Sequence, residues 1–364
     1  MSDVRLVIAG GGTGGHVNPA LAIADAFRAR YPSADIVFIG TERGLETRLV
    51  PARGYPLKLV DGSRLVGAGL VGKLRGLLAL VRGVSQARRM LRDQGAQVVI
   101  GVGGYASGAG LLAAKTLGVK TAIHESNAVP GMTNKVLGWL VDRVYLGFEA
   151  AADSFPARKI CVTGNPVREE IAALPARQVV DAETRKVLIV GGSQGALFLN
   201  QSVPALLTEV AARGVKLQIR HQVGKLDAAP VAEAYSSAGL DAEVVSYIDD
   251  MAAALSWADF AVTRSGSGTV SELAAAGLPA LLVPFPYAAG DHQAANAAAF
   301  CAEGGGIWSR QRDWNIEKLA DSVTSVITDS NSLQSAAEGA RAVAKAEAAR
   351  AVVDDCAYWL GEPR

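Results

Sequence analysis

Short apolar runs rich in β-branched residues alternate with alanine- and leucine-rich stretches along the whole chain, and this alternation strongly constrains the fold. Such an order predicts a parallel sheet covered by helices. In the first half, strands are predicted at residues 4–9, 36–39, 98–102, 120–123 and 143–146. After Gly164-Asn165-Pro166 the order restarts, with strands predicted at residues 187–190, 217–220, 243–246, 260–263 and 280–283. The expected fold class is α/β, with two Rossmann-like, doubly wound parallel-sheet domains facing a cleft.

Chain length agrees with two domains, because 364 residues exceed what one hydrophobic core usually organises. We place the N-terminal domain at residues 1–164 and the C-terminal domain at residues 165–340. The alanine-rich stretch at residues 332–359 is predicted to be helical. Residues 341–364, which include the end of this stretch, are expected to pack back on the N-terminal domain.

Composition argues against several classes of protein. With 36 basic and 35 acidic residues the formal net charge is +1, so no overall field attracts nucleic acid and a charged partner must meet a local patch. The cysteines Cys161, Cys301 and Cys356 are far apart, odd in number and without metal-ligand spacing. They predict a reducing compartment and neither a disulfide framework nor a zinc site. The apolar run at residues 4–9 is followed by glycines instead of a cleavage site, so no signal peptide is expected.

A glycine turn follows the first predicted strand. Residues 10–15 read Gly-Gly-Gly-Thr-Gly-Gly and satisfy the G-x-G-x-x-G dinucleotide pattern, which alone is weak evidence. His16 lies at the mouth of the turn, and Asn18 and Pro19 are predicted to be the N-cap and the first residue of the next helix. So many glycines around one threonine indicate backbone that approaches a ligand closely, with a purely structural turn as the alternative.

A second polar cluster is predicted at the same sheet edge. Residues 101–108 form a glycine-rich turn that contains Tyr105, and the next strand ends in His-Glu-Ser-Asn at residues 124–127. A carboxylate, an imidazole and an amide at a strand end are placed for hydrogen bonding or proton transfer. The alternative is a polar loop tip that caps the helix after residues 130–131.

Two glycine turns of the second half predict phosphate binding. Residues 191–195 and 264–269 each precede a predicted helix, and helix N-termini bind phosphates through free N–H groups and the helix dipole. Glu272 follows Thr269 by three residues, so the two form an ordinary capping box in one interpretation. In the other, the glutamate binds a ribose diol through both carboxylate oxygens.

Two further side chains are candidates for ligand contacts. Gln293 carries an amide that offers both donor and acceptor to sugar hydroxyls. Arg168, just after the predicted domain boundary, can reach a diphosphate, although a lone arginine is more often a solvated surface charge.

The chain resembles one family in segments that occur in the same order: GGTGGHVNPALA, GGYASG, HESNAVPGMTNK, GNPVR, GGSQGA, YIDDMAAAL with ADFAVTRSGSGTVSELAAAGLPALLVPFP, and DHQAANA. Over residues 4–308 it is similar to the MurG-type UDP-N-acetylglucosamine transferases of bacterial peptidoglycan synthesis. Several ordered motifs are far more specific than one glycine loop. The resemblance implies a glycosyltransferase fold of the B type (GT-B), with the acceptor held by the N-terminal domain and the donor mainly by the C-terminal one.

The resemblance also implies the reaction. The family joins N-acetylglucosamine from UDP-GlcNAc to the 4-hydroxyl of the muramyl residue of undecaprenyl-linked lipid I, giving lipid II and UDP with inversion. A peripheral enzyme at the cytoplasmic face of the inner membrane is expected, with an anionic membrane surface and cell-wall synthesis proteins as partners. The implied binding residues are Thr13, Gly14, Gly15, Tyr105, Asn127, Arg168, Ser193, Ile248, Ser267, Gly268, Thr269, Glu272 and Gln293. Ser126 and Gly268 depart from the family, which commonly has glutamine and a larger residue there.

Inversion by one in-line displacement needs a base for the acceptor hydroxyl and no enzyme nucleophile. His16 and Glu125 are the candidate catalytic residues, since a histidine is a usable base at neutral pH. A hydrogen bond from His16 to the donor phosphate is the alternative. The sequence contains no Asp-x-Asp, so helix N-termini and Arg168 are expected to stabilise the leaving UDP, and neither a metal nor another cofactor is expected.

Three other functions compete with this one. A UDP-N-acetylglucosamine 2-epimerase or another GT-B glycolipid glycosyltransferase shares the fold. A Rossmann oxidoreductase needs a ribose-binding acid about 20 residues beyond the first glycine turn, and the candidate Glu42 comes late and behind Gly40. A non-catalytic sensor would bind UDP-GlcNAc without turnover.

Residues 64–92 are predicted to meet an anionic membrane surface. They contain no acid and seven basic residues, interleaved with leucine and valine: Arg64, Lys73, Arg75, Arg82, Arg88, Arg89 and Arg92. The charges interrupt the apolar stretch, so it cannot span a bilayer, but each is worth about 1 kcal/mol at an anionic surface. The alternative is an ordinary amphipathic helix with core-facing leucines and a solvated basic face.

Overall fold

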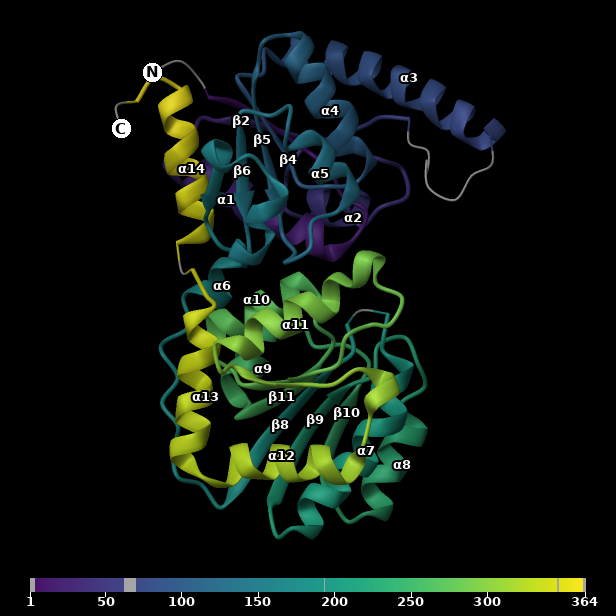
Figure 1. Cartoon of the computed structure of the whole chain (residues 1–364), viewed down its shortest axis with the longest axis vertical. Helices are drawn as coiled ribbons and strands as arrows, with labels where there is room; N and C mark the ends of the chain where they lie inside the picture. Colours follow the sequence, from purple (N-terminus) through teal and green to yellow (C-terminus); the bar gives the residue numbers. More distant parts are fainter. Residues whose placement is uncertain (1–3, 62–69, 193, 346, 363–364) are drawn as a thin grey trace. The chain divides into compact units, whose positions relative to one another are not determined.

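The structure is a computed structural model that describes residues 4–61, 70–192, 194–345 and 347–362, with the backbone alone at residues 70–77. The chain forms two compact units, each built around one parallel sheet (Figure 1). Unit 1 comprises residues 1–168 and 347–364, and unit 2 comprises residues 169–346. The predicted α/β class with two parallel-sheet domains is confirmed.

The sheet of unit 1 has seven strands in the order β3-β2-β1-β4-β5-β6-β7. The strands are β1 (Arg5–Ala9), β2 (Asp35–Gly40), β3 (Leu57–Leu59), β4 (Val98–Gly101), β5 (Lys120–Glu125), β6 (Arg143–Leu146) and β7 (Ile160–Val162). Five of them lie where the sequence predicts strands. The other two, β3 and β7, are three-residue edge strands.

Helices cover both faces of this sheet. They are α1 (Gly14–Arg30), α2 (Glu46–Ala52), α3 (Leu70–Gln94), α4 (Tyr105–Thr116), α5 (Met132–Leu137) and α14 (Ala348–Trp359), with the 3₁₀ turns η1 (Glu149–Ser154) and η2 (Ala157–Lys159). Because strand side chains alternate between faces, Leu6 and Ile8 of β1 pack with α1 and α14. Val7 and Ala9 pack with α3 and α4 on the other face. In Figure 1, α3 lies beside α4.

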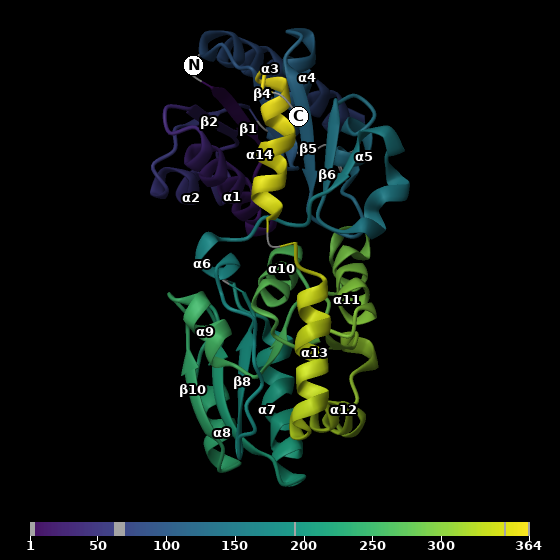
Figure 2. The same cartoon turned by 90° about the vertical axis from the view of Figure 1, so that its left-hand side faces the viewer.

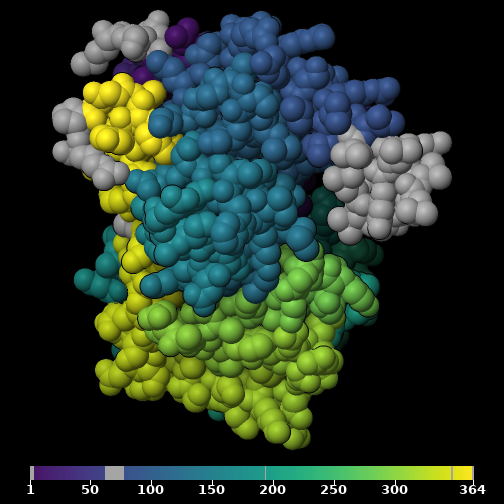
Figure 3. Space-filling view, turned by 45° about the horizontal axis from the view of Figure 1, so that its top comes forward, coloured from purple at the N-terminus to yellow at the C-terminus, as the bar shows by residue number. Residues whose placement is uncertain are grey.

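The C-terminal helix α14 belongs to unit 1, and Figure 2 shows it in front of the sheet of this unit. Val352 and Val353 are buried in the core that α1 shares with the sheet. The Arg143 Nε atom donates to Asp355 Oδ2 at 2.9 Å, and the Tyr145 hydroxyl donates to the same oxygen at 3.1 Å. In the space-filling view of Figure 3, the last residues, in yellow, meet the blue surface of this unit.

The sheet of unit 2 has six strands in the order β10-β9-β8-β11-β12-β13. They are β8 (Thr184–Val190), β9 (Lys216–Gln222), β10 (Asp241–Val245), β11 (Phe260–Thr263), β12 (Ala280–Leu282) and β13 (Gly306–Trp308). The sequence predicts all of them except β13. The helices are α6 (Glu169–Ala172), α7 (Leu197–Ala212), α8 (Ala229–Ser237), α9 (Met251–Trp257), α10 (Ser267–Ala276), α11 (His292–Ala302), α12 (Ile316–Thr328) and α13 (Ser330–Ala342), with η3 (Ala289–Asp291) and η4 (Gln311–Asp313).

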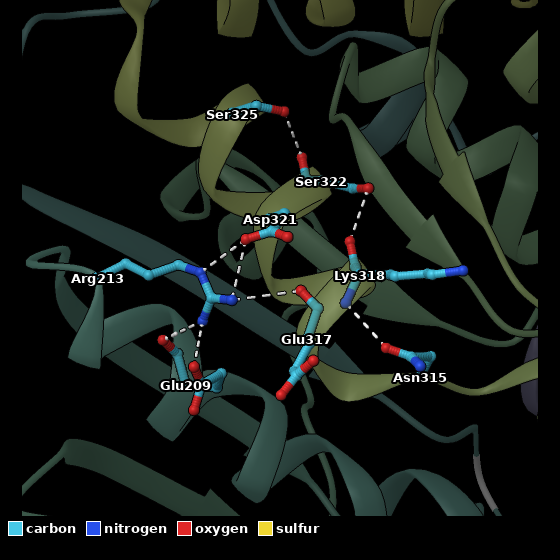
Figure 4. A network of polar contacts seen from close by, with 8 residues as sticks. All are labelled: Glu209, Arg213, Asn315, Glu317, Lys318, Asp321, Ser322 and Ser325. Carbon is cyan, nitrogen blue, oxygen red and sulfur yellow. Dashed lines mark hydrogen bonds and ion pairs between the residues drawn. The ribbon is translucent and has the colours of Figure 1, made fainter.

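An arginine joins two helices on one face of this sheet (Figure 4). Arg213, which follows α7, donates from Nε and Nη2 to Asp321 Oδ1 of α12 at 3.0 and 2.9 Å, and from Nη1 to Glu209 Oε1 at 2.6 Å. The apolar sides of α7 and α12 share one buried core, to which Leu206 and Val323 contribute. Apolar burial therefore holds this layer, and the exposed ion pairs add little.

None of the helices in the described part of the chain is long and apolar enough to cross a membrane.

Candidate active site

Both sheets have a switch point, where neighbouring strands lead to connections on opposite sides. It lies between β1 and β4 in unit 1 and between β8 and β11 in unit 2. Ligands of doubly wound sheets bind outside the carboxyl ends of the strands at such points. Four predicted glycine turns follow these four strands, so each unit carries its candidate residues at the expected edge.

The N–H groups of the first glycine turn are divided between the fold and the solvent. At residues 10–12 they donate to Ile39 O at 2.9 Å, to Gly103 O at 3.3 Å and to the Glu46 carboxylate at 2.7 Å. The N–H groups of the predicted binding residues 13–15 have no acceptor within the described ranges. Because these groups begin helix α1, they are the part of the turn able to bind an anion.

Helix α1 begins earlier than the sequence predicts. Its first residue is Gly14 and its N-cap is Thr13, so the prediction that Asn18 caps the helix is wrong. Pro19 lies inside the helix, where its missing N–H leaves the carbonyl of Gly15 without the usual helical bond. Glycine adopts helical dihedral angles readily enough to start the helix inside the turn.

The half-buried ring of His16 has a defined orientation. Its Nδ1 atom lies 3.1 Å from the carbonyl oxygen of Gly11, which can only accept, so Nδ1 carries the hydrogen. In the neutral ring Nε2 is then the acceptor. A Cβ atom on Gly103, where φ is +100°, would lie 2.9 Å from Nε2, so the glycine leaves room for the ring. This tautomer is the one that can take a proton at Nε2.

Glu125 is 2% exposed and braces the loop that follows β5. Its Oε1 atom accepts from the N–H and the side-chain amide of Asn127 at 2.9 and 3.1 Å. Its Oε2 atom accepts from the N–H of Gly131 at 3.0 Å and from Asn134 Nδ2 at 2.9 Å. Both oxygens are occupied by groups of the loop, which favours a positioning role over proton transfer.

The neighbouring residues of this loop are also bonded inside unit 1. Burial lowers the pKa of His124 to about 4, a hydrogen bond with the Gly164 backbone opposes this shift, and His16 lowers the pKa further. The Ser126 hydroxyl is 3.3 Å from His124 Nδ1, and the Ser126 carbonyl accepts from Asn165 Nδ2 at 2.9 Å. Serine at this position is thus part of the internal bonding.

A cavity of about 960 Å³ opens beside the first glycine turn. Its wall includes Arg43, Asp61, Arg82 and Tyr105. The Tyr105 hydroxyl is buried and has no hydrogen-bond partner in the described ranges. Burial raises the pKa of Tyr105, and Asp61 adds to the shift. A buried hydroxyl without a partner is costly, so Tyr105 is suited to bind a polar group of a ligand.

In unit 2, one glutamine joins two segments that carry predicted binding residues. The Gln222 amide nitrogen donates to the carbonyls of Gly192 at 3.1 Å and Ser246 at 3.0 Å. It thereby ties the turn after β8 to the segment that contains the half-buried Ile248. No sequence motif indicates Gln222. Ser193, predicted in the same turn, lies outside the described residues.

Helix α10 begins at Ser267 with Gly266 as N-cap, and no side chain caps it. Thr269 lies inside the helix, so the capping-box interpretation of Thr269 and Glu272 is wrong. Both are half-buried, and Ser267 is 5% exposed. A Cβ atom on Gly268 would meet nothing within 4 Å. The backbone thus accepts the larger residue of the family.

Helix α11 places Gln293 beside the end of β12. Its Oε1 atom accepts from the N–H of Phe285 at 2.9 Å, which orients the amide nitrogen as the remaining donor. The Ser265 hydroxyl donates to the Gln293 carbonyl at 2.8 Å. Arg264 donates to main-chain carbonyls, and burial lowers its pKa to about 10. Arg168, half-buried, is the last residue of the first stretch of unit 1.

No group of three or more histidine, cysteine, aspartate or glutamate residues in the described ranges could hold a metal ion.

Known proteins match both units. Residues 6–146 match the model of the glycosyltransferase family 28 N-terminal domain, and residues 186–353 match that of the family 28 C-terminal domain. The chain is 42% identical over 351 residues to a UDP-N-acetylglucosamine--N-acetylmuramyl-(pentapeptide) pyrophosphoryl-undecaprenol N-acetylglucosamine transferase of Geobacter sp. (strain M21). That match covers 96% of this chain and 95% of the relative.

Two solved structures match the chain with different sequence identities. The chain matches the crystal structure of Acinetobacter baumannii MurG with a TM-score of 0.80 and 32% identity, over 96% of this chain and 98% of that one. A UDP-N-acetylglucosamine 2-epimerase matches with a TM-score of 0.67 but 14% identity, over 99% and 97% of the two chains. The second likeness shows a common fold alone.

Proposed function

The chain belongs to glycosyltransferase family 28, and we propose how its residues divide the steps of the reaction. Within this family it belongs to the transferases that add N-acetylglucosamine to N-acetylmuramyl-(pentapeptide) pyrophosphoryl-undecaprenol. The enzyme transfers N-acetylglucosamine from UDP-GlcNAc to lipid I, giving lipid II and UDP for peptidoglycan synthesis. The observation that carries this function is the 42% sequence identity to the Geobacter transferase over 96% of this chain. The acceptor atom is the 4-hydroxyl of the muramyl residue, and the transfer inverts the anomeric carbon.

His16 is the general base of this displacement. The acceptor oxygen forms a bond to the anomeric carbon while the bond from that carbon to the phosphate oxygen breaks, and UDP leaves with the electron pair. The proton of the acceptor hydroxyl passes to Nε2 of His16, which the hydrogen bond from Nδ1 to Gly11 leaves as the acceptor. The ring later releases this proton to solvent.

Residues 1–164 bind the acceptor in this proposal. The free N–H groups of Thr13, Gly14 and Gly15 bind its diphosphate, since a helix N-terminus favours an anion. Tyr105 donates its unpartnered hydroxyl to the acceptor from the wall of the cavity. Glu125 acts as a positioning residue that holds Asn127 toward the substrate, and is not the base.

Residues 165–340 bind the donor. The start of α10, with Ser267, Gly268 and Thr269, supplies N–H groups for the diphosphate of UDP-GlcNAc together with Arg168 and Ser193. Glu272 binds the ribose, Ile248 contacts the base, and Gln293 donates its amide to the sugar. With these groups the leaving UDP is stabilised without a metal ion or other cofactor.

A membrane-facing surface of unit 1 is a further part of the proposal. The enzyme meets the anionic cytoplasmic face of the inner membrane, where its lipid substrate lies, and other cell-wall synthesis proteins join it there. Leu78 and Val81 of α3 are 52% and 61% exposed, and Met132 and Trp139, on and just after α5, are 73% and 67% exposed. Such side chains favour a lipid interface when basic residues accompany them. Arg64 lies outside the described residues, as do the side chains of Lys73 and Arg75.

Vesicle binding tests the membrane surface. Trp139→Glu and Leu78→Glu are expected to weaken co-sedimentation with anionic vesicles, whereas Val180→Glu, which changes a 71% exposed valine of unit 2, is the matched control. Equal binding to neutral and anionic vesicles, or wild-type binding by the first two variants, would contradict this surface.

Release of UDP with and without lipid I tests the reaction. The transferase releases UDP only when the acceptor is present and forms a lipid-linked disaccharide. An epimerase would form a new nucleotide sugar or release UDP without acceptor, and a sensor would release none. Either of these outcomes would overturn the proposed reaction.

A further inference from the structure

A buried carboxylate lies at the base of the first glycine turn. Glu46, the first residue of α2, is 1% exposed. Its Oε2 atom accepts from the N–H of Gly12 at 2.7 Å, and its Oε1 atom accepts from the N–H and the hydroxyl of Thr41 at 3.1 and 3.2 Å. No cation pairs with it in the described ranges. Because a buried charge is costly, a carboxylate held only by neutral donors points to a role for its charge.

Three glycines from separate segments leave the space for this carboxyl group. A Cβ atom on Gly11 would lie 2.3 Å from Glu46 Cδ, one on Gly40 would lie 2.6 Å from Cγ, and one on Gly44 would lie 1.8 Å from Oε2. Any side chain at these positions would displace the carboxyl group. The turn after β1, the end of β2 and the loop before α2 are therefore built around Glu46.

Glu46 and His16 bond to opposite sides of one peptide group. The N–H that donates to Glu46 is that of Gly12, and the carbonyl that accepts from His16 Nδ1 is that of Gly11. These two groups belong to the same planar, conjugated amide. A carboxylate bound to the N–H polarises the amide and makes its oxygen a stronger acceptor.

We propose that Glu46, through the Gly11–Gly12 peptide, holds His16 in the Nδ1–H tautomer, so that Nε2 receives the proton of the acceptor hydroxyl. Glu46 is a positioning residue, and the inference rests on the proposed role of His16 as base. When Nε2 takes the proton, the ring gains a positive charge and its Nδ1–H stays bonded to Gly11. The buried negative charge stabilises this cation across one peptide group.

The tautomer of His16 is measured without any activity assay. Protein labelled with ¹³C and ¹⁵N in its histidines is examined by NMR, and the His16→Gln spectrum assigns the signal of His16. In the wild type, neutral His16 is expected to be mainly the Nδ1–H form, although free imidazole side chains favour Nε2–H. A mainly Nε2–H ring in the wild type would overturn the proposal, whatever the variants do.

Glu46→Gln removes the charge while nearly preserving the shape. We expect this variant to shift His16 toward the Nε2–H form and to lower turnover by about 10- to 100-fold, the scale of a misplaced catalytic group. The KM for UDP-GlcNAc is expected to change less than about 2-fold, because the proposed donor residues belong largely to unit 2. Glu46→Asp keeps the charge, and we expect it to lose the tautomer because the shorter side chain cannot reach Gly12.

Glu42→Gln is the matched control. Glu42 lines the same cavity but has no bond to the turn, so this variant is expected to keep the wild-type tautomer. Wild-type tautomer and turnover in Glu46→Gln would overturn the proposal. Normal turnover in His16→Ala would instead overturn the proposed function of His16, and the tautomer shift would still decide whether Glu46 holds the ring.

Discussion

Replacing His221 with glutamine is expected to remove part of the acid sensitivity of unit 2. His221 is fully buried in β9, with Nδ1 2.9 Å from the Tyr235 hydroxyl and Nε2 3.2 Å from Asn200 Oδ1. Burial lowers the pKa of His221 to about 4, because the charged ring loses its hydration there. A histidine of the unfolded chain has a pKa of about 6.5.

The sign and size of the effect follow from these two values. The unfolded chain takes up a proton at higher pH than the folded one, so the contribution of His221 is complete above about pH 6.5 and is lost toward pH 4. Between pH 7.5 and 5.0 the loss is about 2 kcal/mol of the free energy of unfolding. In unit 1, buried His124, with its pKa also lowered to about 4, acts in the same direction.

The loss is measured by urea unfolding at both pH values, with hydrogen exchange of unit 2 peptides as the readout. His221→Gln cannot titrate, so its decrease in stability should be about 2 kcal/mol smaller than that of the wild type. Tyr235→Phe is the matched control. It removes the hydroxyl partner of His221 but keeps the buried imidazole, so the free energy of unfolding falls at both pH values and the difference between the two pH values is unchanged. Equal pH dependence in the wild type and His221→Gln would refute the reasoning.

Three further changes test the donor site of unit 2. Glu272→Gln is expected to weaken UDP-GlcNAc binding in calorimetry by about 1 to 3 kcal/mol, with a nearly unchanged thermal midpoint, because the pair with Thr269 is not a helix cap. Gln222→Met breaks both bonds between the donor-site segments and should raise the donor KM about 10-fold, or about 1.4 kcal/mol; an unchanged KM would remove Gln222 from the site. Gly268→Ala adds a methyl group that meets no atom of the described residues in the first turn of α10, so denaturant unfolding should show a gain of up to about 1 kcal/mol, and a loss of stability would contradict this expectation.

The sequence predicted the main strands because buried parallel strands are continuous apolar runs followed by glycine turns. The edge strands β3, β7 and β13 escaped prediction because they are short and only partly buried, whereas β12, which is equally short, is a fully buried apolar run. The predicted start of α1 was also wrong. Asn18-Pro19 is a strong local signal for a helix N-terminus, but the glycines before it already adopt the helical conformation.

The candidate residues of the site were found through motifs, and the residues that hold them were not. Glu46 is 34 positions from Gly12, and Gln222 is 30 positions from Gly192, so no local pattern joins either pair. Glu125 was expected to share in proton transfer. Its hydrogen-bond partners lie up to nine positions further along the chain, and only the folded structure shows that they occupy both of its oxygens. Burial and long-range contacts are properties of the folded chain, and local sequence patterns do not predict them.

The central claim, that His16 is the base of the transfer, is tested most directly by the turnover of His16→Ala at saturating UDP-GlcNAc and lipid I. Loss of a general base predicts a fall of at least about 100-fold, with UDP binding by unit 2 retained. Near-normal turnover at saturation, or a defect confined to the donor KM, would contradict the claim and leave His16 a binding residue.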